Sequence, residues 1–155
     1  MRIVDLKTVY KLEGVAASVK YGGKLYDFGT FNIRISKRHK CPDDAIKVKR
    51  VSPPNFATYN GRIHPHIGSE GAICYGEEYD EEEDVWTYNY DYIERLLKLK
   101  EYASIGDFLI NFLNSYNEDN AYWELYNEYC ANCGECSEHC ECEHKATPPA
   151  NSKAN

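Results

Sequence analysis

Apolar and polar residues alternate along several short segments in the first half of the chain. Residues 30–36, Thr-Phe-Asn-Ile-Arg-Ile-Ser, place an apolar side chain at every second position. A period of two is typical of an antiparallel strand that is buried on one face. Residues 45–51 alternate in the same way through Ile46 and Val48, and the pattern stops at a Ser-Pro-Pro sequence. Both segments are therefore predicted to be strands.

Further strands are predicted upstream of these two. Residues 15–21 and 25–28 are rich in apolar side chains and flank Gly22-Gly23-Lys24, a sequence that favours a hairpin turn. Residues 7–12 are expected to add a strand at the edge of the sheet. Together the segments predict a meander of three or four antiparallel strands.

The second half of the chain changes to a helical period. In residues 104–116 apolar side chains recur three and four positions apart, which predicts an amphipathic helix. Ser104, followed three residues later by Asp107, resembles a capping box. Residues 91–102 and 118–129 predict two more helices. Strands followed by helices indicate an α+β fold, an antiparallel β-meander with helices packed on one face.

Length and charge limit the domain number and the partners. A chain of 155 residues fits one compact domain and a tail. We place the domain at residues 1–128, and a cysteine-rich segment with a disordered tail at 129–155. The formal net charge of −7 argues against binding to nucleic acid or to anionic membranes. Apolar runs are too short for a membrane span, and the first residues lack a signal-peptide pattern, so a cytoplasmic setting with reduced thiols is expected.

A segment rich in glycine and proline, residues 53–76, lies between the predicted strands and helices. It contains His64, His66 and Cys74. A thiolate is a competent nucleophile, and nearby hydrogen-bond donors can stabilise the oxyanion that forms when it attacks a carbonyl. The segment is therefore a candidate active site.

The same segment resembles the active-site signature of ubiquitin-conjugating enzymes (UBC-like proteins). In that family a Pro-Pro pair and an aromatic residue precede His-Pro-Asn, and Gly-x-Ile-Cys follows about seven residues later. The matching residues of this chain are Pro53, Pro54, Phe56, Ile63, His64, Pro65, Ile67, Gly71, Ile73 and Cys74. The resemblance covers roughly residues 26–125. Within the family, the pattern of this chain is similar to that of the divergent prokaryotic or viral branch.

The resemblance implies a mechanism and a role for each matching residue. Cys74 would carry a ubiquitin-like modifier as a thioester and pass it to an amine of a protein substrate. His66 stands where the family has asparagine, and it would hydrogen-bond the developing oxyanion. His64, Pro65 and Gly71 would shape the active-site loop. The resemblance also implies an activating enzyme as a partner and no small cofactor.

Other interpretations of these residues remain open at this stage. Cys74 is alternatively a buried structural cysteine in a non-catalytic binding or scaffold protein of the same fold. His66 is alternatively an exposed loop residue. Imidazole and thiolate are also zinc ligands, but the spacing of His64, His66 and Cys74 matches no recognised zinc motif.

An acidic segment follows the candidate nucleophile. Residues 77–84 contain seven carboxylates in eight positions. Some ubiquitin-conjugating enzymes have an acidic loop beside the cysteine, which by analogy would recruit a basic partner or a substrate lysine. A block of like charges is otherwise typical of a solvated, flexible loop.

Five further cysteines are concentrated near the end of the chain. They are interleaved with His139 and His144, and they are Cys130, Cys133, Cys136, Cys140 and Cys142. The cluster offers more than the four ligands of a structural zinc ion, although it lacks the long spacer of a zinc ribbon. A metal-binding protein that acts through this segment, with zinc as the ion, is therefore a further alternative.

Overall fold

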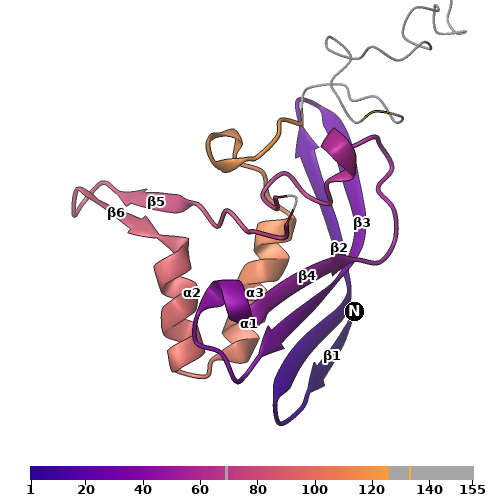
Figure 1. Ribbon diagram of the computed structural model, residues 1–155. Helices are drawn as coiled ribbons and strands as arrows, with labels where there is room; N and C mark the ends of the chain where they lie inside the picture. The colour runs from indigo at the N-terminus through magenta and orange to yellow at the C-terminus, as the bar shows by residue number, and fades with distance from the viewer. Residues whose placement is uncertain (69, 126–132, 134–155) are drawn as a thin grey trace, which may run out of the picture.

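A four-stranded antiparallel sheet forms the body of the protein (Figure 1). The computed structural model describes residues 1–68, 70–125 and 133. The strands lie in the sheet in their sequence order, β1 (Arg2–Asp5), β2 (Val9–Tyr21), β3 (Lys24–Ser36) and β4 (Ile46–Arg50). The predicted meander is confirmed, and its central hairpin turns at residues 22 and 23 as expected.

The alternating positions of the strands separate a buried face from a more polar face. In β3, Phe31, Ile33 and Ile35 are at most 1% exposed. They pair across the sheet with Arg50, Val48 and Ile46 of β4. The prediction for the edge strand is wrong in position: residues 9–12 begin β2, and the edge strand is β1, which pairs with residues 10–13.

Two helices cover the buried face of the sheet (Figure 1). They are α2 (Asn89–Lys98) and α3 (Tyr102–Leu113), and a short helix, α1 (Pro42–Ala45), precedes β4. The Tyr10 ring of β2 stacks on Tyr102, and the Leu12 side chain packs closely against Gly106 of α3. The α+β class with helices on one face of the meander is therefore confirmed.

The boundaries of the two long helices differ from the prediction. Lys100 has a φ of 60°, a left-handed conformation that ends the path of α2 and lets α3 begin at Tyr102. The predicted capping box at Ser104 is wrong, because Ser104 lies inside α3. The N-cap is Glu101, whose side chain makes no capping hydrogen bond.

The acidic segment forms a β-hairpin rather than the flexible loop considered above. Strand β5 (Glu77–Asp80) pairs with β6 (Val85–Tyr88), and the hairpin extends away from the body of the protein (Figure 1). The turn includes Asp84, which has a φ of 54°. All eight strand residues are exposed, so the hairpin has no alternation between buried and exposed positions. The sequence pattern therefore did not predict these two strands.

The predicted helix at 118–129 is wrong over the residues that the structure describes. Residues 118–120 form a single 3₁₀ turn, η2 (Glu118–Asn120), and residues 121–125 are irregular. The Asn117 side chain accepts a hydrogen bond from the Asp119 N–H, as in an Asx turn. The boundary that we predicted at residue 128 lies outside the described residues. Among those described, no helix is long and apolar enough to cross a membrane.

A close backbone approach at Gly29 positions the segment that leads to the candidate site. A Cβ at this position would lie 2.2 Å from the Ser52 carbonyl oxygen and 2.8 Å from that of Pro53. Gly29 also has a φ of 89°. Only glycine therefore allows the chain after β4 to cross β3 at this distance.

We expect Gly29→Ala to destabilise the protein by roughly 3 kcal/mol or more, because both the conformation and the space oppose a side chain. Gly23→Ala is the matched control, since its φ is 77° but no atom lies within 4 Å of the added Cβ. The control should cost only about 1 kcal/mol. Urea unfolding measures both, and equal losses would contradict the role given to the close approach.

Candidate functional site

The loop that carries Cys74 is held by its own backbone. Short bridges join His64 to Ile67 and Ile67 to Ile73. The Cys74 N–H donates to the His66 carbonyl oxygen at 2.8 Å. The chain from His64 to Cys74 therefore folds back on itself, and this loop brings His66 and Cys74 side by side.

The His64 imidazole connects this loop to the end of α3. Its Nε2 lies 2.9 Å from the Leu113 carbonyl oxygen, which can only accept, so Nε2 carries the proton. Its Nδ1 accepts the His66 backbone N–H at 3.1 Å. The side chain is 0% exposed, and both ring nitrogens have a partner.

The His66 imidazole makes an equivalent pair of bonds with the opposite tautomer. Its Nδ1 donates to the Asn120 carbonyl oxygen at 3.0 Å, and its Nε2 accepts the Asn117 N–H at 3.1 Å. The residue is 2% exposed. In this arrangement both ring nitrogens of His66 are bonded to the backbone. The ring has no free N–H to donate to an oxyanion, which is the role that the resemblance implies for His66.

Both histidines are neutral. Burial lowers the pKa of His64 to about 3, although its bond to the Leu113 carbonyl opposes that shift. Burial also lowers the pKa of His66, against the opposing effect of the Asn120 carbonyl. A second proton on either ring would place an N–H against a backbone N–H, so the hydrogen bonds themselves require the neutral form.

The segment after α3 packs over the histidine loop. The Tyr122 N–H donates to the Pro65 carbonyl oxygen at 2.7 Å, and the Trp123 indole donates to the His64 carbonyl oxygen at 3.1 Å. In a helix the Tyr122 N–H would donate to the carbonyl four residues earlier, whereas here it donates to a distant loop. The contribution of this segment to the site was missed, because no sequence motif marks it.

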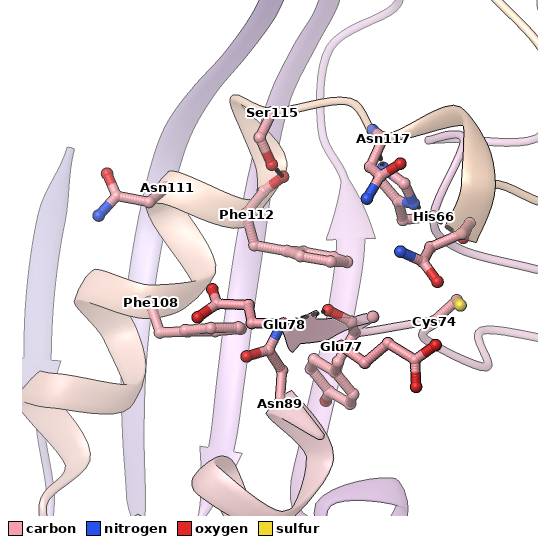
Figure 2. Close-up of a pocket in the computed structure, with 13 residues that line it drawn as sticks. His66, Cys74, Glu77, Glu78, Asn89, Phe108, Asn111, Phe112, Ser115 and Asn117 are labelled. Atoms are coloured by element: carbon pink, nitrogen blue, oxygen red, sulfur yellow. Dashed lines mark hydrogen bonds between the residues drawn. The ribbon is translucent and has the colours of Figure 1, made fainter. Parts of the chain in front are cut away.

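A pocket of about 400 Å³ opens beside Cys74. The Cys74 residue is partly exposed, and it lines this pocket together with His66, Glu77 and Glu78. Figure 2 shows the Cys74 sulfur at one end of the pocket and Phe108 and Phe112 of α3 at the other. An accessible thiol on the wall of a partly apolar pocket is able to receive an acyl group.

Asn120 supplies a carboxamide to the same pocket. Its Nδ2 would lie 3.1 Å from a Cβ at Gly76, two residues after Cys74, so the amide packs directly on this backbone. The side chain has no hydrogen-bond partner among the residues that the structure describes. Within the described part of the chain it is an unpaired donor and acceptor in the pocket that Cys74 also lines, and the sequence pattern did not identify it.

The other predicted loop residues take structural positions. Pro65 is buried and contributes its carbonyl to the contact with Tyr122. Gly71 is exposed with a φ of 82°, and no atom lies within 4 Å of a Cβ built there. Its backbone conformation, rather than crowding, therefore favours glycine at this turn.

The cysteines outside the pocket separate into two groups. Cys41 is partly buried, and its sulfur lies 3.2 Å from the Tyr90 hydroxyl. Cys133 is exposed, whereas Cys130, Cys136, Cys140 and Cys142 lie outside the described residues. Within the described part of the chain, no group of three or more His, Cys, Asp or Glu residues could hold a metal ion. Zinc binding by the cysteine cluster stays a prediction.

No protein-family model, curated protein or solved structure matches this chain.

The two neutral histidines make the stability of the protein depend on pH. The unfolded chain binds protons on its histidines as the pH falls through about 6.5, whereas His64 in the folded protein stays neutral down to about 3. The unfolded state is therefore favoured by acid. The contribution of these histidines to the unfolding free energy should be constant above pH 7 and should fall towards pH 5, by at most about 1.4 kcal/mol per pH unit for each histidine.

Urea unfolding at several pH values measures this slope. His64→Gln should be less stable than the parent at pH 8 but should show a flatter dependence between pH 7 and 5. His39→Gln, at an exposed position, is the control and should keep the parental slope. An unchanged slope in His64→Gln would rule out His64 as its source.

Proposed function

We propose that this chain is a UBC-like thioester-transfer enzyme in which Cys74 carries the C-terminus of a ubiquitin-like modifier. The observation that carries the proposal is the partly exposed Cys74 thiol on the wall of a pocket, in a loop fixed by two buried histidines. The order of Pro53-Pro54, His64-Pro65 and Ile73-Cys74 along the sequence supports the same family.

The reaction has two acyl-transfer steps. The modifier arrives as a thioester on its activating enzyme, the Cys74 thiolate attacks the carbonyl carbon, and the thiolate of the activating enzyme leaves. An amine of the protein substrate then attacks the new thioester and gives up a proton to solvent, and the Cys74 thiolate is released. Each step passes through a tetrahedral oxyanion, and neither step requires a redox agent or a small cofactor.

Asn120 is the group that donates to this oxyanion in our proposal. Its carboxamide has no partner among the described residues and lines the pocket with Cys74, whereas both nitrogens of His66 are occupied by the backbone. His66 acts as a positioning residue instead. Its backbone carbonyl accepts the Cys74 N–H, and its ring bonds to the backbone of Asn117 and Asn120. His66 therefore sets the distance between the Cys74 nucleophile and the Asn120 donor.

The first test is the formation of a covalent adduct on Cys74. We expect incubation with a modifier, its activating enzyme and ATP to give an adduct that a thiol reductant releases. Cys74→Ser should abolish this adduct or replace it with a reductant-stable ester. Denaturing electrophoresis and intact-mass spectrometry measure both results.

Cys41→Ser is the matched control, because Cys41 is also a partly buried single cysteine. It should load as the parent does. If Cys74 never loads with activating enzymes that charge other carriers, the enzyme proposal is wrong, and a non-catalytic binding protein of the same fold becomes the better account.

The second test separates the donor from the nucleophile. Asn120→Ala should still accept the modifier as a thioester, but its discharge to free lysine should slow by roughly 100-fold, the usual effect of losing an oxyanion donor. Single-turnover discharge of preloaded protein measures this rate. His66→Ala should slow discharge too and should also lower stability, because its ring bonds hold the turn.

Asn32→Ala, in the sheet, is the control and should discharge at the parental rate. Parental discharge by Asn120→Ala would assign the oxyanion to another group. Because that variant still loads, this result would leave the thioester proposal standing.

A further inference from the structure

The hairpin of β5 and β6 exposes large apolar side chains without covering any core. Trp86 is 58% exposed, Tyr88 55% and Val85 46%. A two-stranded hairpin has marginal stability by itself in water, and grouped exposed aromatics are typical of interaction sites. The hairpin therefore has the character of a docking element.

The aromatic side chains of the hairpin gather on one face. Tyr79 pairs with Trp86 across the strands and Glu77 pairs with Tyr88, so these four residues share a side. The Tyr79 and Trp86 ring centroids are 5.1 Å apart. This face is an ordered aromatic surface bordered by carboxylates.

A pocket of about 580 Å³ lies between β6 and α2. Its walls combine aromatic rings with carboxylates. The lining residues include Glu78, Trp86, Tyr88, Asp91, Tyr92 and Arg95. Aromatic faces and carboxylates together favour a cation, through cation–π and charge attraction.

The protein itself already places a cation on this wall. The Arg95 guanidinium lies over the Tyr92 ring at 5.5 Å from the centroid. The remaining rings of the pocket have no cation over them among the described residues. The geometry of the wall therefore accepts a guanidinium or ammonium group.

The charge of the hairpin indicates what kind of partner carries that cation. Residues 77–84 contribute seven carboxylates, and no Lys or Arg occurs between Arg62 and Arg95. A segment of uniform sign at an exposed tip attracts an oppositely charged chain over distances near the Debye length. Nucleic acid and anionic lipid are repelled by the same charge.

We infer that the pocket between β6 and α2 binds an arginine or lysine side chain of a basic protein segment. The aromatic rings hold the cation, and the hairpin carboxylates hold the basic residues that flank it. The inference does not rest on thioester chemistry. Its location is nevertheless relevant to that chemistry, because Glu78, Asn89 and Phe108 line both this pocket and the one beside Cys74.

A hexa-arginine peptide with blocked ends is the probe, added to the full-length protein at low salt. The chain has two tryptophans, of which Trp86 is 58% exposed and Trp123 4% exposed. Binding should therefore perturb the fluorescence of Trp86 and the NMR signal of its indole N–H, while the Trp123 signal stays unchanged. Added salt should weaken binding, and hexa-glutamate should not bind.

Two variants separate the pocket from general charge attraction. Tyr88→Leu removes a ring of the pocket that is 55% exposed and has no described cation over it, and it should weaken binding by about tenfold. Replacing Glu81, Glu82 and Glu83 with Gln should weaken binding and reduce its salt dependence, while the Trp86 perturbation at saturation persists.

Tyr122→Leu is the matched control, because Tyr122 is an exposed tyrosine, 45% accessible, that does not line this pocket. It should bind the peptide with parental affinity. Equal affinity of the parent and Tyr88→Leu, or perturbation of both tryptophans alike, overturns the inference. Absence of saturable binding by the parent overturns it as well.

Discussion

The buried pair His64 and His66 is the constraint on which the candidate site depends. Each neutral imidazole donates to one backbone carbonyl and accepts one backbone N–H, and the two rings carry their protons on opposite nitrogens. Through these bonds the loop before Cys74 is joined to the end of α3 and to the turn at residues 117–120. The loop thus meets two successive segments that lie 49 to 54 residues further along the chain.

The same bonds explain why burying two histidines is tolerated. A buried polar group without a partner costs about 1–3 kcal/mol, and an unpaired charge costs more. Here every ring nitrogen is paired, and the neutral form avoids the cost of a buried charge. Because backbone groups use all four nitrogens, chemistry at Cys74 has to draw on other donors. In the proposed enzyme, one set of residues, the two histidines, fixes the geometry of the site. A different set contacts the substrate.

The strands were predictable because burial imposes their period. Phe31, Ile33 and Ile35 face the core, and their spacing in the sequence is the spacing of the pleat. The core face of α3 followed from the same principle with the helical period. The acidic hairpin was not predictable, since strands exposed on both faces leave no hydrophobic alternation.

The candidate site was predictable only in part. The order of His64, His66 and Cys74 indicated one loop, and the structure places them in one. The predicted helix at residues 118–129 is wrong over residues 118–125, the part that the structure describes. Its apolar residues have a helical spacing, but Tyr122 and Trp123 bond to the His64–Pro65 backbone. Such tertiary bonds override local propensity, so the carboxamide of Asn120 could not be placed beside Cys74 from sequence alone.

The position of Asn89 links the hairpin to the thiol. Its N–H donates to the Gly76 carbonyl at 3.0 Å, and its Nδ2 donates to the Tyr75 carbonyl at 2.9 Å. These two residues directly follow Cys74, so the base of the hairpin is fixed to the chain that carries the thiol while its tip remains exposed. A partner that bound the hairpin would therefore be held at a defined place relative to Cys74. The acidic segment, through Glu77 and Glu78, is in the folded protein one wall of the pocket beside Cys74.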